Sequence, residues 1–127
     1  MAGATNQLVA WVNEASPLHD KREYDAVVAS GEQVTAGLTA IVLQSMGLKA
    51  RSWSGWQIPV ETSDAHGAAR ILNVPADKLR ASIDAGEVAV ITGFQGIDPE
   101  TERVSTLGRG GSDTSAVAVA VALKADV

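Results

Sequence analysis

The sequence predicts an α/β domain in which helices cover both faces of a mostly parallel β-sheet. Segments with helical spacing alternate with short strand-like segments along the chain. Residues 88–92 form a continuous apolar run that ends at Gly93, which is typical of a strand buried on both faces of a parallel sheet. The length of 127 residues, with 46% hydrophobic and 20% charged residues, fits one globular domain.

The first half of the chain is predicted to form three helices. The first spans residues 6–15, with Asn6 as its N-cap. The second spans residues 21–30 and is interrupted by Gly31, and the third spans residues 32–46. The apolar face of the third helix is formed by Val34, Leu38, Ile41, Val42 and Ser45.

The second half alternates between strands and helices. Besides residues 88–92, the expected elements are a strand at 49–53, a strand at 69–74, a helix from Pro75 with Leu79 and Ile83 facing inward, a β-hairpin at 97–107, and a helix at 114–124 capped by Ser112. Only about three or four core strands can be counted, and an α/β unit would enter a further strand after the last helix. We therefore expect uncovered sheet edges and apolar faces, which favour a homo-oligomer or pairing with a complementing chain.

Composition excludes several classes of protein. A net charge of −5 without a Lys/Arg cluster argues against nucleic-acid binding. The absence of cysteine excludes disulfides and thiolate metal sites. We find no signal peptide and no apolar stretch long enough to span a bilayer, so we expect a cytoplasmic protein without membrane contact.

The segment Gly108-Arg109-Gly110-Gly111-Ser112-Asp113 is the strongest local signal for a binding site. Glycines let the backbone approach a ligand closely and point N–H groups at it. Ser112 begins a predicted helix, whose N-terminus favours anions, and Arg109 supplies a planar fork suited to a carboxylate. The alternative is a flexible glycine turn followed by an ordinary serine cap. A Walker A loop is excluded because its spacing and its lysine are absent.

Three further segments allow both a functional and a structural interpretation. Glu32 follows Gly31 at a predicted helix start, where it could bind an ammonium group or stabilise the helix dipole. Thr5 could hold a ligand or act as an ordinary capping residue. Asp64 and His66 share a polar loop, but with two histidines in the chain we expect neither a metal site nor a Ser-His-Asp triad. We expect His66 to order its loop.

Four segments, in this order, resemble the successive signatures of aspartate kinases. They are Met1-Ala2-Gly3-Ala4-Thr5-Asn6, then Ser30-Gly31-Glu32-Gln33-Val34, then Thr62-Ser63-Asp64-Ala65-His66-Gly67, and finally Gly93-Phe94-Gln95-Gly96 followed by Thr106-Leu107-Gly108-Arg109-Gly110-Gly111-Ser112-Asp113-Thr114. The whole chain is similar to that family, and residues 51–71 resemble its proteobacterial members in particular.

The resemblance implies the amino-acid-kinase fold, an αβα sandwich on a mainly parallel sheet, of which residues 1–127 would form a partial domain. It implies transfer of the γ-phosphoryl group of ATP to the side-chain carboxylate of L-aspartate, on the way to lysine, threonine and methionine. ATP with Mg²⁺ would be the co-substrate, and no cofactor would be tightly bound. The implied site residues are Arg109 on a carboxylate of aspartate, Glu32 on its ammonium group, Thr5 near the transferred phosphoryl group, Gly110, Gly111 and Ser112 lining the pocket, and Asp113 orienting the family's catalytic lysine.

The chain also departs from the family pattern. Aspartate kinases carry a Lys-Phe-Gly-Gly-Thr-Ser motif, Thr-Asp and Asp-Gly-Val signatures that hold the nucleotide, and C-terminal ACT domains, none of which occurs in these 127 residues. We therefore expect that the chain alone does not phosphorylate aspartate, and that ATP binds only when the missing segments are supplied. The alternative is a truncated or engineered folding or assembly module, without catalysis, whose aspartate site is vestigial.

Overall fold

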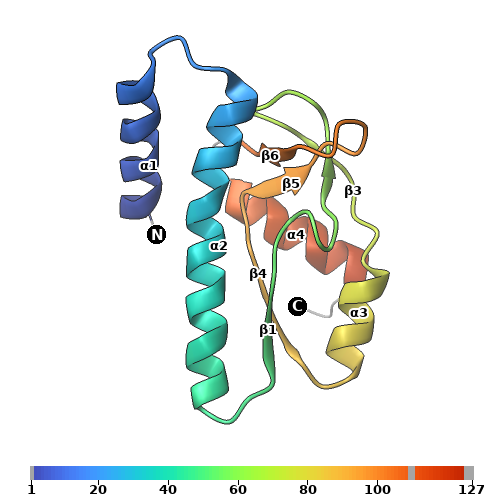
Figure 1. The fold of residues 1–127 in the computed structure, drawn as a ribbon. Helices are drawn as coiled ribbons and strands as arrows, with labels where there is room; N and C mark the ends of the chain where they lie inside the picture. Colours follow the sequence, from blue (N-terminus) through green and yellow to red (C-terminus); the bar gives the residue numbers. More distant parts are fainter. Residues whose placement is uncertain (1, 109–110, 125–127) are drawn as a thin grey trace.

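The protein is described here by a computed structural model that covers residues 2–108 and 111–124, with side chains from residue 6 onward. Figure 1 shows the arrangement of the elements. The helices are α1 (Ala2–Ala15), α2 (Lys21–Ser45), α3 (Asp77–Asp84) and α4 (Gly111–Leu123). The strands are β1 (Ala50–Trp53), β2 (Glu61–Thr62), β3 (Ile71–Asn73), β4 (Val88–Ile91), β5 (Gln95–Ile97) and β6 (Val104–Thr106).

The strands form two small sheets. β1 pairs in parallel with β4, from Ala50 opposite Val88 to Trp53 opposite Ile91. This agrees with the expected parallel strands, although the sequence did not identify which strands are paired. The second sheet has the order β3-β2-β5-β6, and its β5–β6 hairpin confirms the predicted one. β2 was not predicted, because two residues are too few to show a period.

Burial of β4 on both faces was predicted and is wrong. Val88 is 40% exposed, and the rest of the strand is only half-buried. The reason is the size of the sheet, since within the described residues β4 has β1 as its only hydrogen-bonded neighbour.

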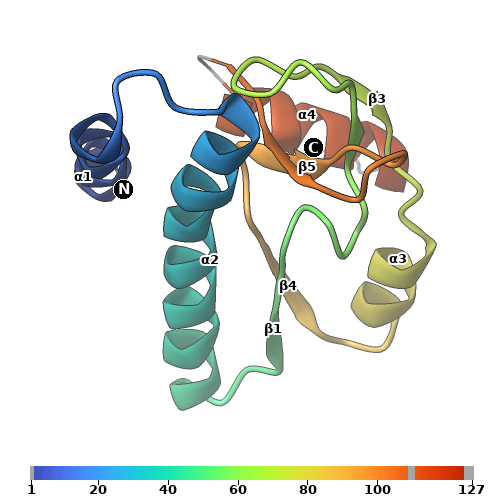
Figure 2. The ribbon, with the colours of Figure 1, turned by 45° about the horizontal axis from the view of Figure 1, so that its top comes forward.

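Helices lie on both sides of the β1–β4 pair, as the α/β prediction requires. Figure 2 shows α2 on one side and α3 and α4 on the other, with α1 against the outer side of α2. The core lies between β1, α3 and α4. It consists of Trp53, Ile58, Val60, Ala76, Leu79 and Val119. Of the two residues predicted to face inward from α3, Leu79 is fully buried whereas Ile83 is 40% exposed.

α2 is one continuous helix of 25 residues, so the predicted break at Gly31 is wrong. A Cβ atom at Gly31 would lie 3.0 Å from Leu8 Cδ1, and the glycine therefore lets α1 pack closely against α2 without interrupting α2.

The N-cap of α2 is Asp20, whose carboxylate accepts a hydrogen bond from the Arg22 backbone N–H. Hydrogen bonds from the Arg22 side chain hold the pKa of Asp20 well below its ordinary value. α1 begins at Ala2, so Asn6 is not its N-cap.

Four apolar side chains in the second half of α2 face solvent rather than the sheet. Val34, Leu38, Ile41 and Val42 are each more than half exposed, and we call them the α2 stripe. The buried side of α2 carries mainly small residues such as Ala29, Ala36 and Ala40, which allow the helix to lie close to β1 and β6.

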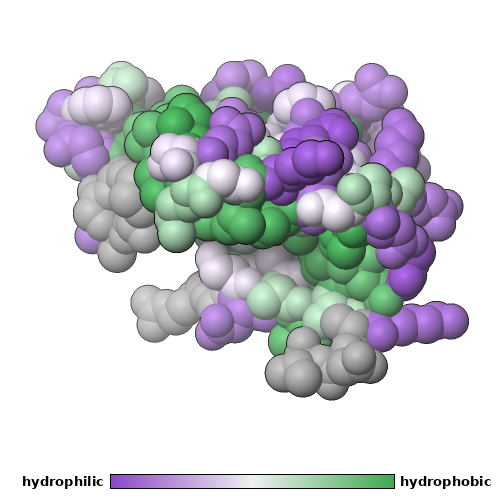
Figure 3. Space-filling view, turned by 90° about the horizontal axis from the view of Figure 1, so that it is seen from below, coloured by the Kyte–Doolittle hydropathy of each residue, from purple (hydrophilic) through white to green (hydrophobic). Residues whose placement is uncertain are grey.

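Hydrophobic residues also gather at the end of the molecule where α2 ends, as Figure 3 shows from that side. The exposed hydrophobic residues at this end include Met46, Leu48 and Val88.

By length and composition alone, α2 is long and apolar enough to cross a membrane, and the α2 stripe contributes to its apolar character. The expectation that no stretch meets this test is therefore wrong. The test is weak evidence, because a helix of a soluble fold can pass it as well. α2 contacts β1, β4 and β6, and it buries the polar side chain of Asp25 against Thr106 of β6, which is the arrangement of a helix packed on a sheet.

Candidate functional site

A hollow of about 460 Å³ lies where three segments far apart in the sequence meet. α2 contributes Glu32, the end of β4 contributes Ile91 and Gly93, and α4 contributes one face. The residues from α4 are Ser112, Ser115, Ala116, Val119 and Ala120. The structure thus brings together Glu32 and Ser112, two residues that sequence reasoning had singled out 80 positions apart.

Gly93 allows the end of β4 to touch the start of α4. A Cβ atom added at Gly93 would lie 3.1 Å from Ser112 Oγ and 3.2 Å from Ser112 Cα. The next residue, Phe94, has a φ of 69°, a left-handed conformation that non-glycine residues rarely adopt. Its backbone N–H donates to Ser115 Oγ at 3.1 Å, and its carbonyl accepts from Leu107 N at 2.8 Å. Strained backbone of this kind is concentrated at binding sites.

The glycine-rich segment is packed against the same turn. Gly111 begins α4, and its N–H donates to the carbonyl of Gly108 at 3.0 Å. A Cβ atom at Gly111 would lie 2.8 Å from Leu107 Cβ and 3.0 Å from Phe94 Cδ1, so this position also requires glycine. Because α4 begins at Gly111, the predicted N-cap Ser112 stands in the first turn of the helix instead. The dipole of α4 makes this end of the helix favourable for an anion.

The other predicted site residues have different outcomes. Arg109 and Gly110 lie outside the described residues. Thr5 lies within α1, but its side chain is outside the described part. Gly111 is buried and does not line the hollow, and Asp113 is exposed in the first turn of α4. Their roles remain predictions.

His66 is held away from the hollow. Its side chain is 6% exposed, and its Nδ1 lies 2.8 Å from Asp25 Oδ2, which confirms the prediction that it orders its loop. Asp64 and His66 line a separate, open surface hollow with the start of α2. No group of three or more His, Asp or Glu residues that could hold a metal ion occurs among the described residues.

Sequence reasoning missed several residues that shape this site. Phe94 and Ser115 form the turn beside it, and the buried polar residues Asp25 and Gln95 connect the segments around it. Only Phe94 and Gln95 had a signal, as part of the segment Gly93-Phe94-Gln95-Gly96. Asp25 and Ser115 could not be distinguished from ordinary polar residues of a helix.

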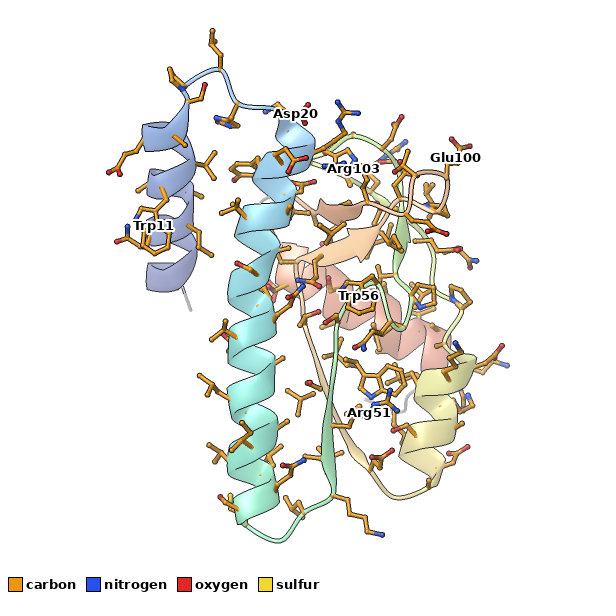
Figure 4. The ribbon with its side chains drawn as sticks, in the orientation of Figure 1. Trp11, Asp20, Arg51, Trp56, Glu100 and Arg103 are labelled. Atoms are coloured by element: carbon orange, nitrogen blue, oxygen red, sulfur yellow. The ribbon has the colours of Figure 1, made fainter. Side chains whose placement is uncertain are left out.

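Another hollow, of about 690 Å³, lies between β1 and α3. The Arg51 guanidinium stands over the ring of buried Trp53 at 4.1 Å from its centroid, and Trp56 is 47% exposed. Figure 4 shows Arg51 near α3 and Trp56 above it. No lining residue is shared between this hollow and the first one. Neither Glu32 nor Ser112 lines this hollow.

Comparison with known proteins decides the family. The profile of the amino acid kinase family matches residues 2–127. The chain belongs to the amino acid kinase family.

Its curated relatives within this family include several aspartokinases. The enzyme of Corynebacterium glutamicum is 42% identical over 127 residues, which is 100% of this chain and 30% of the relative. The enzyme of Geobacillus stearothermophilus is 44% identical over 99% of this chain and 31% of its own length. Aspartate kinase Ask_LysC of Stutzerimonas stutzeri is 47% identical over 99% of this chain and 30% of its own length. The chain thus spans about a third of the length of these relatives.

Solved structures give the same result. Escherichia coli aspartokinase III in complex with aspartate and ADP has a TM-score of 0.80 and 26% identity, and the match covers 94% of this chain and 27% of that one. The same enzyme in complex with lysine and aspartate has a TM-score of 0.75 and 27% identity over 85% of this chain and 25% of that one. The predictions of an amino-acid-kinase fold and of a likeness to the aspartate kinases, which are phosphotransferases, are confirmed.

Proposed function

We propose that residues 1–127 form the acceptor-binding part of an aspartate kinase domain, with L-aspartate as the ligand. The observation that supports this proposal is the hollow shared by Glu32, Gly93 and Ser112, all three of which lie in segments that resemble aspartate kinase signatures. The identity of 42–47% to aspartokinases over nearly the whole chain adds support.

The proposed residues match the charges of an amino acid. Glu32 supplies the negative group that an ammonium requires at one wall of the hollow. The first turn of α4 offers N–H groups and a positive dipole end, and Arg109 would add a bidentate fork for a carboxylate. In this proposal Thr5 lies near the transferred phosphoryl group, the backbone of Gly110 and Gly111 supports the pocket, and Asp113 orients the lysine of the family.

The proposed reaction transfers the γ-phosphoryl group of ATP to the side-chain carboxylate, giving 4-phospho-L-aspartate and ADP. Phosphoryl transfer depends mainly on positioning and on neutralising charge. The 127 residues contain no Lys-Phe-Gly-Gly-Thr-Ser motif and no nucleotide signatures, so we propose that this chain positions the acceptor while other segments hold ATP. Mg²⁺ would arrive with the nucleotide. Action in the cytoplasm, within lysine, threonine and methionine biosynthesis, is part of the same proposal.

Calorimetry with L-aspartate and with ATP, titrated separately, tests the proposal. We expect saturable binding of aspartate, at least about tenfold weaker binding by Glu32→Gln, and no heat from ATP. Glu100→Gln is the matched control, because Glu100 is an exposed carboxylate in the β5–β6 loop. A hydroxamate assay for aspartyl phosphate should show no turnover above that of Arg109→Ala. Absence of aspartate binding, or equal binding by Glu32→Gln, would contradict the proposed site and favour a vestigial one.

A further inference from the structure

The buried carboxylate of Asp25 receives four hydrogen bonds. The side chain is fully buried, and Thr106 donates to it twice, from the backbone N at 3.0 Å and from Oγ1 at 2.5 Å. The Gly67 N–H donates at 3.1 Å, and His66 Nδ1 lies at 2.8 Å. A buried carboxylate is costly unless it is hydrogen-bonded in this way, so these contacts fix the position of Asp25.

These hydrogen bonds connect α2 to the strand that leads into the glycine-rich segment. Thr106 is the last residue of β6 and precedes Leu107 and Gly108. Its carbonyl accepts from Ala69 N at 3.1 Å, so both backbone polar groups and the hydroxyl of Thr106 are engaged. The place where the glycine-rich segment begins is therefore set by Asp25.

Asp25 and Glu32 lie on the same face of α2. They are seven residues apart on one continuous helix, which corresponds to about two turns and about 10.5 Å along the axis. Since the helix is rigid over this distance, holding Asp25 against Thr106 also fixes Glu32 relative to the glycine-rich segment.

A second buried contact lies one turn from Glu32. Gln95 is fully buried, its Nε2 donates to the carbonyl of Ala29 at 2.8 Å, and its Oε1 accepts from Gly55 N at 3.2 Å. Gln95 directly follows Phe94, so it fixes the turn at the end of β4 to the same helix. Two buried polar contacts, at Asp25 and at Gln95, thus fix the position of α2 relative to the end of β6 and to the turn after β4.

We propose that Asp25 is a positioning residue of the acceptor site, and that it sets the separation between Glu32 and Gly108, the residue at which the glycine-rich segment begins. The inference rests on the proposed function, because it takes the ligand to be an amino acid whose ammonium and carboxylate groups contact these two places. A ligand of fixed span requires a fixed separation, and a displacement of about 1 Å at such a site can cost about 100-fold. A merely structural role would lower stability without changing affinity in the folded protein.

The test compares Asp25→Asn with Ser105→Ala. Ser105 is equally buried and precedes Thr106, but its Oγ is hydrogen-bonded to Thr62 of β2 at 2.6 Å rather than to α2. Calorimetry with L-aspartate is done at a temperature where circular dichroism shows each variant folded. We expect the Kd to rise at least about tenfold in Asp25→Asn and to stay within about twofold in Ser105→Ala.

A distance measurement separates this inference from the proposed function. The chain contains no cysteine, so spin labels at Gln33→Cys and Gly108→Cys report the separation directly by electron paramagnetic resonance. We expect a shifted or broadened distance distribution in Asp25→Asn and an unchanged one in Ser105→Ala. If the unaltered protein does not bind aspartate, the proposed function fails, and an unchanged distance would still overturn the role of Asp25.

A milder variant keeps the test decisive if Asp25→Asn does not fold. Thr106→Val removes the hydroxyl that donates to Asp25 Oδ1 and retains the other three hydrogen bonds. We expect a smaller change of Kd and of distance in the same direction. Effects no larger than those of Ser105→Ala would overturn the proposal.

Discussion

Replacing Gly93 by alanine should disturb the site at the contact between β4 and α4. The added Cβ would lie 3.1–3.2 Å from three atoms of Ser112, including its Cα, so relief requires a shift of the α4 backbone and not only of a flexible side chain. Overpacking of this kind costs about 1–3 kcal/mol. For a chain of this length, 1 kcal/mol corresponds to a change in Tm of about 3–5 °C.

Gly37→Ala provides the matched control. Gly37 lies within α2, and a Cβ added there meets nothing within 4 Å. Alanine in the interior of a helix is favoured over glycine by about 0.5–1 kcal/mol, so this variant should be more stable than the unaltered protein. The same substitution is thus expected to have opposite effects at two positions, according to the space that each one offers.

Urea denaturation followed by circular dichroism measures both variants, and calorimetry with L-aspartate measures the site. We expect Gly93→Ala to lose stability and to bind aspartate at least about tenfold more weakly, whereas Gly37→Ala binds as the unaltered protein does. The reasoning about the β4–α4 contact would be refuted if Gly93→Ala matched the unaltered protein in both measurements.

Two further predictions concern the core and the uncovered surface. Leu79→Ala removes a fully buried side chain from the core and should cost about 2–5 kcal/mol in a urea titration, whereas a loss under 1 kcal/mol would contradict the observed packing. Ile41→Glu places a charge in the exposed α2 stripe and should reduce self-association, measured by light scattering, without loss of stability. Leu72→Glu, at a position of similar exposure on β3, should leave self-association unchanged. A protein that is monomeric at high concentration before substitution would count against the predicted association.

Part of the candidate site could be predicted from local sequence. Glu32 and Ser112 were identified because each stands beside glycine near an expected helix start, and both line the hollow. The turn at Phe94 could not be predicted, because its φ of 69° depends on hydrogen bonds with Ser115 and Leu107. Asp25 could not be predicted either, because its partner Thr106 is 81 positions away.

The sequence by itself determined the α/β class, the presence of parallel strands, the β5–β6 hairpin and the family. Hydrophobic periodicity and the positions of glycines are local features of the sequence, so they can be recognised without knowledge of the fold. Only the tertiary structure decided that α2 continues through Gly31, where close packing of Leu8 favours a residue without a side chain. It also decided that α2 turns mainly small residues to the sheet and exposes Val34, Leu38, Ile41 and Val42. A helix packed close to a sheet leaves little room for large side chains between them.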